Sequence, residues 1–293
     1  QGRVVGGTTV VNWTASFRTP AATLAYWQRH FGLTDLTVGE MQPWWEMMER
    51  RLNIEPWRAP PNRNNRLLAQ GLVRLGIPFA VIPRNVKLCW DLGYCGMGCP
   101  TNAKQSMLVT TIPAALDRGA ELLHHARAER LVFEGGAVQE IVCTVMQADG
   151  RERRRDAVRV RARHVVLAGG GINTPALLLR SAAPDPHRLI GRRTFLHPTT
   201  GSASQFADPV DAFAGAPQSI YSDHFLDTYP IDGPLGFKLE VPPVHPMLIA
   251  STLVGVGEEH AAWMKRLRHL HPVLALLRDG FHEESAGGTV QLR

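Results

Sequence analysis

The sequence predicts a mixed α/β fold that changes to an α+β pattern in its last third. Two observations predict it. Glycine-rich turns stand at residues 6–7 and 169–171, and the second lies between an apolar run and the start of a helix. Between these turns, several short runs of partial apolar alternation are separated by a Gly-Gly and an Asp-Gly pair, which is typical of hairpins. A chain of 293 residues is long enough to bury a large core in one or two domains.

The first glycine turn opens a short polar segment, residues 6–12. Gly6 and Gly7 allow the backbone to approach a bulky ligand closely. Thr8 and Thr9 add hydroxyl groups, and Asn12 offers a donor and an acceptor on one short side chain. Such a segment suits a large flat polar cofactor such as a flavin, although an ordinary turn has a similar composition.

The second glycine turn lies within residues 164–181. The apolar residues 165–168 predict a buried strand, and residues 169–171 predict the turn after it. Thr174 is expected to cap a helix that has Pro175 at its first position. A glycine turn before a helix N-terminus suits phosphate or ribose oxygens, but a purely structural turn would look alike.

The other elements follow from apolar periodicity and from the prolines and glycines that interrupt it. We expect helices over residues 19–32, 42–52, 66–75 and 112–118, the first capped by Thr19 and the second starting at Pro43. We expect strands over residues 122–125, 128–133, 138–146 and 158–166, then 219–225, 248–256 and 289–292. Hairpin turns are expected at residues 135–136 and 149–150, and the basic run 151–155 is expected at a solvated hairpin tip.

Together the two glycine turns resemble the signatures of the glucose–methanol–choline (GMC) family of flavin oxidoreductases. Residues 6–12 are similar to its Gly-Gly-Ser/Thr-Ser/Thr-x-x-Asn signature. In the second signature Thr174-Pro175, the leucines that follow and Ser181 match, whereas Gly171 and Ala182 depart from it mildly. Residues 98–120 resemble the intervening part of bacterial long-chain alcohol dehydrogenases of this family.

The resemblance implies a GMC-type FAD-binding fold, with a β-meander and an antiparallel-sheet substrate domain, incomplete at both ends. The family's N-terminal Gly-x-Gly-x-x-Gly segment and its C-terminal catalytic histidine have no counterpart in the chain, so no catalytic residue is assigned. The implied division is an FAD signature segment at 1–18, a helical lid and cysteine-rich loop at 19–106, the rest of the FAD domain at 107–191 and a partial substrate domain at 192–293.

The resemblance also implies which residues bind FAD. The pyrophosphate and flavin would lie along Gly6, Gly7, Thr8 and Thr9, and the isoalloxazine would lie near Asn12, Trp13 and Thr14. The adenosine part would lie near Ala128, Ala168 and Gly169, with Thr174 at the following helix.

Three of the four cysteines are clustered as Cys89-x5-Cys95-x3-Cys99 in a glycine-rich segment. The spacing excludes a Cys-x-x-Cys redox motif and is not that of a zinc site. The resemblance suggests an iron–sulfur cluster, because bacterial glucose dehydrogenases of the family carry a three-iron cluster in a similar place. Those proteins have a doubled cysteine there, whereas Trp90 follows Cys89 in this chain, so the cluster is the weaker alternative cofactor. Buried free thiols or one disulfide are the alternatives, and no metal ligand is assigned.

The predicted function is FAD-dependent hydride transfer from an alcohol to the flavin and on to an electron acceptor, such as a cytochrome or a quinone system. A catalytically incomplete flavin- or cluster-binding electron-transfer fragment and another flavoenzyme, such as an amine oxidase, remain as alternatives. The net charge is +6, but no basic stripe with interleaved aromatics indicates nucleic-acid binding. Without a signal peptide or a membrane-spanning run, we expect a cytoplasmic protein that associates with a membrane only through a partner.

Overall fold

The computed structural model describes residues 2–226, 228–233 and 236–292. The chain divides into two compact units, each taken here by itself. Unit 1 comprises Gln1–Ala120 and His197–Phe281, and unit 2 comprises Glu121–Leu196 and His282–Arg293. The mixture of helices with antiparallel sheets confirms the predicted fold class.

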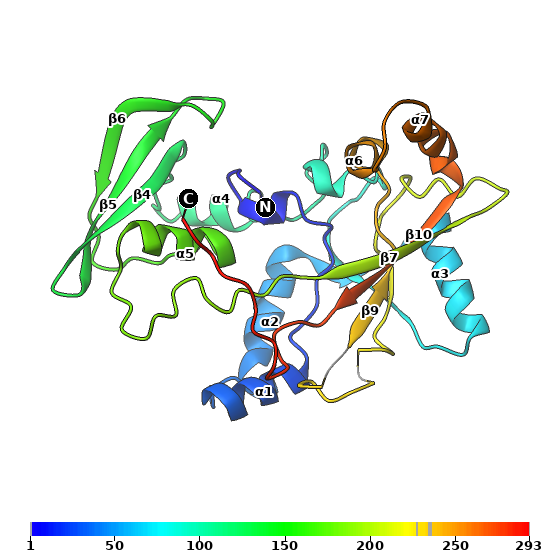
Figure 1. The fold of residues 1–293 in the computed structure, drawn as a ribbon, viewed down its shortest axis with the longest axis horizontal. Helices are drawn as coiled ribbons and strands as arrows, with labels where there is room; N and C mark the ends of the chain where they lie inside the picture. The colour runs from blue at the N-terminus through cyan, green and yellow to red at the C-terminus, as the bar shows by residue number, and fades with distance from the viewer. Residues whose placement is uncertain (1, 227, 234–235, 293) are drawn as a thin grey trace. The chain divides into compact units, whose positions relative to one another are not determined.

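Unit 2 is built on a three-stranded meander (Figure 1). Its antiparallel strands are β4 (Ala126–Glu134), β5 (Ala137–Met146) and β6 (Arg153–Val160), and helix α5 (Gly170–Arg180) packs against β4. Ser181, just after α5, accepts a hydrogen bond from the backbone N–H of Leu131 at 2.8 Å. The meander therefore has the hairpin order that the sequence predicts.

The two hairpin turns of the meander form where the sequence predicts them. Gly135 and Gly136 both have positive φ, which glycine adopts without a Cβ penalty. In the second turn, the Asp149 carboxylate accepts hydrogen bonds from the backbone N–H groups of Arg151 and Glu152. The basic run is divided, however, because β6 already begins at Arg153.

Unit 1 is built on a five-stranded antiparallel sheet in the order β2-β8-β9-β10-β7. Its strands are β2 (Ala80–Val81), β7 (Thr199–Gln205), β8 (Ile220–Ser222), β9 (Phe237–Glu240) and β10 (Leu270–Leu277). A separate two-stranded sheet pairs β1 (Ile54–Pro56) with β3 (Pro83–Asn85). The core at the five-stranded sheet includes Leu68, Leu72, Ile220 and Val241.

The described helices of unit 1 lie around these sheets. They are α1 (Ala21–Phe31), α2 (Val38–Leu52), α3 (Arg63–Arg74), α4 (Thr111–Leu116), α6 (Pro246–Thr252) and α7 (Gly257–Arg266), with short 3₁₀ turns η1 (Gly7–Val10), η2 (Cys95–Met97) and η3 (Leu267–His269). The four helices predicted in the first 120 residues are present.

Side-chain caps make two helices longer than predicted. The Thr37 hydroxyl accepts a hydrogen bond from the Glu40 N–H, so α2 begins a turn before Pro43 and takes that proline into its first turns. Likewise the Asn62 side chain accepts from the Asn65 N–H, so α3 begins three residues early. At α1 the N-cap is Pro20 rather than Thr19.

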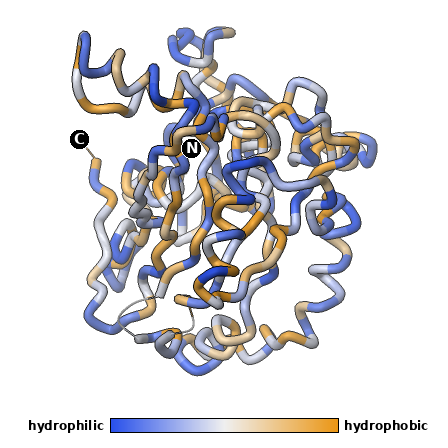
Figure 2. Tube along the Cα trace, turned by 90° about the vertical axis from the view of Figure 1, so that its right-hand side faces the viewer, coloured by the Kyte–Doolittle hydropathy of each residue, from blue (hydrophilic) through white to orange (hydrophobic). Residues whose placement is uncertain are grey.

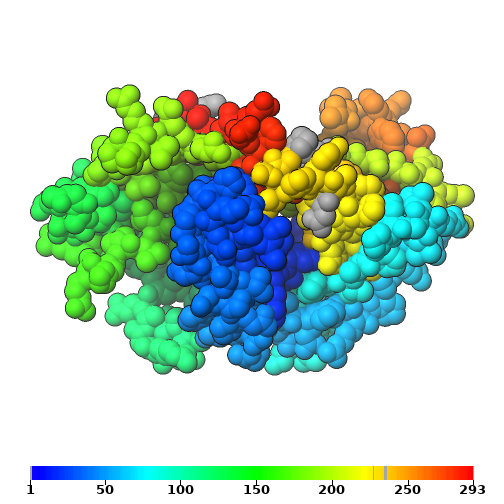
Figure 3. Space-filling model, turned by 90° about the horizontal axis from the view of Figure 1, so that it is seen from below, coloured from blue at the N-terminus to red at the C-terminus, as the bar shows by residue number. Residues whose placement is uncertain are grey.

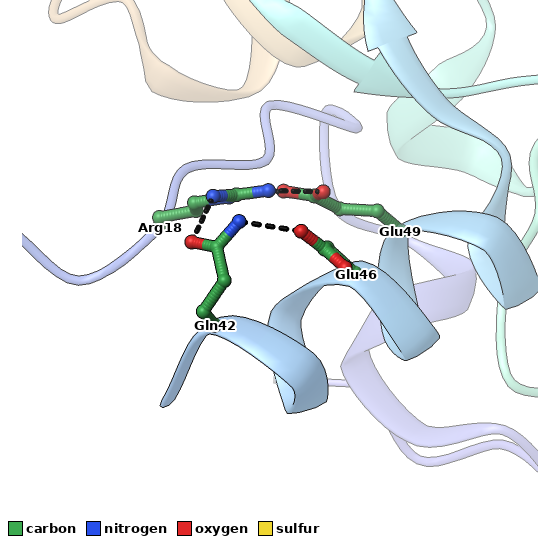
Figure 4. A network of polar contacts seen from close by, with 4 residues as sticks. All are labelled: Arg18, Gln42, Glu46 and Glu49. Carbon is green, nitrogen blue, oxygen red and sulfur yellow. Dashed lines mark hydrogen bonds and ion pairs between the residues drawn. The ribbon is translucent and has the colours of Figure 1, made fainter. Parts of the chain in front are cut away.

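Polar contacts also tie α2 to the N-terminal segment (Figure 4). The Arg18 guanidinium donates to both carboxylate oxygens of Glu49, at 2.6 and 2.7 Å, and to the Gln42 side chain at 2.9 Å. Gln42 in turn donates to Glu46. This network holds the chain immediately after residue 17 against one face of α2.

Four predicted strands are wrong. Residues 122–125 are not a strand, because His125 takes a left-handed φ of 54° that breaks the extended backbone. Residues 165–168 pair with no strand in the described part of the chain, and Val166 is 88% exposed. Of residues 248–256, the first five belong to helix α6, which has Pro246 at its start, and residues 253–256 form neither helix nor strand. Residues 289–292 are extended without pairing, and the neighbouring bridge joins Gly288 to Thr194.

The predicted start of helix α5 and two strand bounds are also corrected. Thr174 and Pro175 lie inside α5, whose N-cap is Gly169. The Thr174 hydroxyl accepts a hydrogen bond from the Gly169 N–H at 2.9 Å, so Thr174 contacts the residue before the helix from inside it and does not cap it. Strand β6 ends at Val160, and β8 is limited to Ile220–Ser222.

Apolar stretches along the trace are short and are interrupted by polar residues (Figure 2). None of the helices in the described ranges combines the length and the apolar character needed to span a membrane.

Candidate active site

A large cavity of about 860 Å³ lies within unit 1. Much of its wall is apolar and includes Phe17, Leu226, Ile231, Leu274, Leu276 and Phe281. The polar side chains on the wall include Asn12, Thr14, His197, Gln218, Lys238 and Glu240. In Figure 3 the blue residues of the N-terminal helices lie beside the yellow residues around β8 and β9, and α1 and β9 both contribute to the wall. An apolar cavity with a few polar groups is the usual form of a site for a small molecule.

Three of the predicted flavin-binding residues, Asn12, Trp13 and Thr14, lie on this wall. Thr14 is fully buried and has a φ of 69°, and its N–H donates to the Asn12 side-chain oxygen. Its carbonyl accepts from Asn85 at 3.3 Å, so the segment runs beside strand β3. Local hydrogen bonds therefore hold the end of the first signature at the cavity.

The paired glycines of the first signature have different surroundings. A Cβ added at Gly6 would lie 2.8 Å from the Val10 side chain and 2.9 Å from the Leu108 backbone, so Gly6 is needed for packing. A Cβ at Gly7 would meet nothing within 4 Å. The backbone beside Gly7 is thus open to a large ligand, and this part of the chain fits a cofactor such as FAD.

The two threonine hydroxyls make internal contacts. Thr8 accepts from the backbone N–H of Gly2 at 3.3 Å. Thr9 donates to the Gly6 carbonyl and accepts from the Met107 N–H at 3.0 Å. Both residues shape the turn, and Thr9 also ties it to the segment before α4.

The cysteine-rich segment packs directly against the first signature. The indole of Trp13 lies over Gly96, where an added Cβ would come within 2.2 Å of the ring. The Lys104 ammonium donates to the carbonyl of Asn12 at 2.7 Å and to that of Cys95 at 2.6 Å. Gly96 and Lys104 therefore determine where Asn12 and Trp13 lie.

A fully buried arginine, Arg84, also contacts the cysteine-rich segment. The Arg84 guanidinium donates to the carbonyls of Pro217 and Gln218 and to the Cys95 sulfur, the last at 3.3 Å. It also lies 5.2 Å from the centroid of the Trp57 ring. Burial lowers the pKa of Arg84, and the neighbouring thiols oppose that effect.

The four cysteines are free thiols. Burial raises the pKa of Cys95. Burial also opposes ionisation of Cys99, but hydrogen bonds from Thr101 and nearby backbone N–H groups prevail and lower its pKa. No three His, Cys, Asp or Glu side chains in the part of the chain that the structure describes are placed to hold a metal ion. Cys89, Cys95 and Cys99 in this arrangement do not fit a shared iron–sulfur cluster.

Strand β9 places two charged residues on the cavity wall. Lys238 and Glu240 are two positions apart and so share one face of the strand. The Lys238 ammonium lies 3.0 Å from the Asp223 carboxylate and 3.7 Å from the centre of the Phe17 ring. Glu240 is 2% exposed and accepts a hydrogen bond from the Gln218 amide at 2.8 Å. Burial raises the Glu240 pKa to about 7, although Lys238 opposes the shift.

The remaining predicted cofactor residues lie in unit 2. Ala128 lies in β4 opposite Cys143, next to a bulge in the pairing. Ala168 and Gly169 form the turn into α5, where Thr174 bonds back to Gly169. Their assignment to the adenosine part of FAD stays a prediction, as does the assignment of the unit 1 residues to the flavin.

Sequence reasoning did not single out Arg84, Lys104 or Glu240. Glu240 could have been suspected from Phe237-Lys-Leu-Glu240, where alternation places two charges on one strand face. Lys104 lies in the stretch that resembles long-chain alcohol dehydrogenases, but its contacts depend on the fold. His197, predicted to be structural, contributes to the cavity wall.

Residues 1–199 match the family model described as GMC oxidoreductase. The chain therefore belongs to the GMC oxidoreductase family. It is 33% identical over 95% of its length to an uncharacterised GMC-type oxidoreductase of Mycobacterium tuberculosis, of which it covers 42%. It is 26% identical to a long-chain-alcohol oxidase of Arabidopsis thaliana, over 100% of the chain and 40% of that relative.

A solved structure confirms the likeness at the level of the fold. The chain is similar to pyridoxine 4-oxidase from Mesorbium loti with a TM-score of 0.67 and 15% identity, over 94% of this chain and 56% of that one. The chain spans half or less of the length of the curated relatives cited here.

Proposed function

We propose that the intact protein is an FAD-dependent oxidoreductase that removes a hydride from the carbinol carbon of an alcohol and passes the electrons to an acceptor. One observation carries the proposal: the end of the glycine signature, Asn12–Thr14, forms part of the wall of a large apolar cavity. The family and the relative named as a long-chain-alcohol oxidase support it.

The residues of this chain would bind and orient both reactants. FAD, when bound, accepts a hydride from a carbon atom. The open backbone at Gly7 and the segment Asn12–Thr14 would hold the cofactor, and the apolar wall would exclude water from the reacting carbon. Glu240 would accept a hydrogen bond from a hydroxyl group in the cavity, since its described donor, Gln218, occupies one carboxylate oxygen.

The cavity favours an alcohol with a long or bulky apolar body. Leucine, isoleucine and phenylalanine side chains form much of the wall, and burying each CH₂ of a substrate against them contributes about 0.8 kcal/mol. We propose a cytochrome or a quinone system as the electron acceptor and a cytoplasmic location, with any membrane association made through that acceptor.

The test uses the intact protein, anaerobically, with primary alcohols of increasing chain length. We expect the flavin absorption to bleach, and the alcohol concentration needed for half-bleaching to fall as the chain lengthens. A tertiary alcohol of matched size is the control, because it fills the cavity but has no carbinol hydrogen to transfer. If flavin is present and no alcohol of the panel bleaches it, the proposed activity is wrong.

A further inference from the structure

Lys104 is a buried cation without a carboxylate partner among the described residues. Lys104 is only 3% exposed. Its ammonium donates to the main-chain oxygens of Asn12 and Cys95, at 2.7 and 2.6 Å, and lies 3.4 Å from the Asn12 side-chain oxygen. Three acceptors from two segments therefore surround a single nitrogen.

This arrangement has a cost in stability. Burial lowers the pKa of Lys104 to about 8, while the thiols of Cys95 and Cys99 act in the opposite direction and Arg84 acts with burial. Burying the protonated ammonium costs free energy, and a methionine would fill about the same volume without that cost. The presence of a lysine here therefore indicates a functional role.

The contacts of Lys104 join the cysteine-rich segment to the first signature. Trp13 and Gly96 make a second connection, since the indole occupies the place where any side chain at residue 96 would stand. Thr9 and Met107 make a third, at 3.0 Å. The first signature is thus fixed at three points, and Lys104 provides the one that carries charge.

We propose that Lys104 is the positioning residue of the flavin-binding segment: its ammonium sets the backbone of Asn12–Thr14 against the cavity and supplies a positive charge on the cofactor side. The inference rests on the proposed function, because it presumes that this segment meets the flavin. It gives the cysteine-rich segment a role as a support, in place of the cluster that its thiols do not fit.

Two consequences follow from general chemistry. Without the ammonium, the Asn12 carbonyl loses a charge-assisted hydrogen bond, and the segment can leave the conformation that binds FAD. A positive charge near a flavin also favours its reduced, more negative form, so the charge raises the reduction potential.

The experiment measures FAD binding and the flavin reduction potential in the intact protein, with the variants K104M and K104R. K87M is the matched control, because Lys87 is an exposed lysine whose backbone bonds to Ala103, next to Lys104. We expect K104M to weaken FAD binding by about tenfold or more, the factor that corresponds to loss of one charged hydrogen bond. We also expect K104M to lower the potential, K104R to restore most of both properties and K87M to match wild type.

The pH dependence gives a second readout that holds even if K104M does not fold. In the wild type, FAD affinity falls as pH rises through about 8 and Lys104 loses its proton, whereas K104R stays charged and shows no such fall. The proposal is overturned if folded K104M binds FAD as tightly as wild type with an unchanged potential, or if wild type and K104R share one pH dependence. If wild-type protein binds no FAD at all, the proposed function itself has failed.

Discussion

Glu140 in unit 2 and Glu240 in unit 1 are both strand glutamates with little exposed surface, 6% and 2%. Glu140 accepts hydrogen bonds from Arg159, in the neighbouring strand β6, and from Arg161, just after that strand. Those arginines lower its pKa despite the opposing desolvation. Glu240 faces a cavity with an amide as its hydrogen-bond donor, and burial raises its pKa to about 7. The same side chain is thus stabilised as an ion in one sheet and destabilised as an ion in the other.

The difference extends beyond this pair. In unit 2 the described ion pairs join exposed arginines to Glu129, Glu140 and Asp156. In unit 1 the buried charged residues Arg84, Lys104 and Glu240 are held by carbonyls, a thiol and an amide. Glu240 lies on the cavity wall, while Arg84 and Lys104 donate to the backbone oxygens of the wall residues Gln218 and Asn12. Because uncompensated burial of charge costs free energy, this arrangement indicates a binding site rather than a stabilising network.

The largest effect is expected from Arg84→Met. The substitution leaves the carbonyls of Pro217 and Gln218 without their donor, which should lower the free energy of unfolding by about 2–5 kcal/mol. Urea denaturation measures this loss. Arg84→Lys should recover only part of it, because one ammonium cannot reach as many acceptors as a planar guanidinium. A wild-type urea midpoint for Arg84→Met would show that the buried guanidinium does not support the fold.

An intermediate effect, with a distinctive sign, is expected from Glu240→Gln. Below pH 4.5 the carboxyl is protonated in both states. Between pH 4.5 and about 7 the unfolded chain releases the proton while the folded chain keeps it, so wild-type stability falls as pH rises, by about 3 kcal/mol in all. Glutamine removes this contribution, and the variant should therefore be more stable than wild type at pH 8 and similar to it near pH 4.5.

Urea denaturation at a series of pH values measures the Glu240 effect. The difference between variant and wild type isolates it, because other titrating groups are shared. Parallel pH profiles would contradict the assignment of a raised pKa to Glu240.

The smallest effect is expected from Glu140→Gln. The arginines lower the Glu140 pKa, so the ionised carboxyl contributes stability at neutral pH that is lost as pH falls through its folded pKa. Since Arg159 and Arg161 are exposed, the contribution is small, and the urea midpoint at pH 7 should stay close to wild type. A change as large as that of Glu240→Gln would remove the contrast between the two units.

The meander could be predicted because its determinants are local. Alternation along residues 128–133 and 138–146, with glycine turns between the strands, is enough to specify consecutive hairpins. The five-stranded sheet could not, because β2 pairs with β8 across about 140 residues and β7, with the sequence Thr-Thr-Gly-Ser-Ala-Ser-Gln, carries no apolar alternation. Residues 248–252 were predicted as a strand from their apolar character, but Pro246 starts a helix there.

The part of the candidate site that lies in one continuous segment could be predicted from the sequence, because its determinants are local. Asn12, Trp13 and Thr14 belong to a contiguous signature whose composition indicates a ligand. Glu240 comes to the cavity through its pairing with Tyr221 and Leu274, which are distant in sequence. The contact of Lys104 with Asn12 joins residues 92 positions apart, which no local pattern encodes.

The visible absorption spectrum of the intact protein, purified without oxygen, tests the central claim most directly. The account predicts an oxidised-flavin spectrum that bleaches when a long-chain primary alcohol is added, with no broad brown absorption from an iron–sulfur cluster. A broad brown shoulder would indicate an iron–sulfur cluster, with Cys89, Cys95 and Cys99 as its ligands, and would contradict that part of the account. Absence of the flavin band would contradict the account, because the segment Asn12–Thr14 would then line a cavity that holds no flavin.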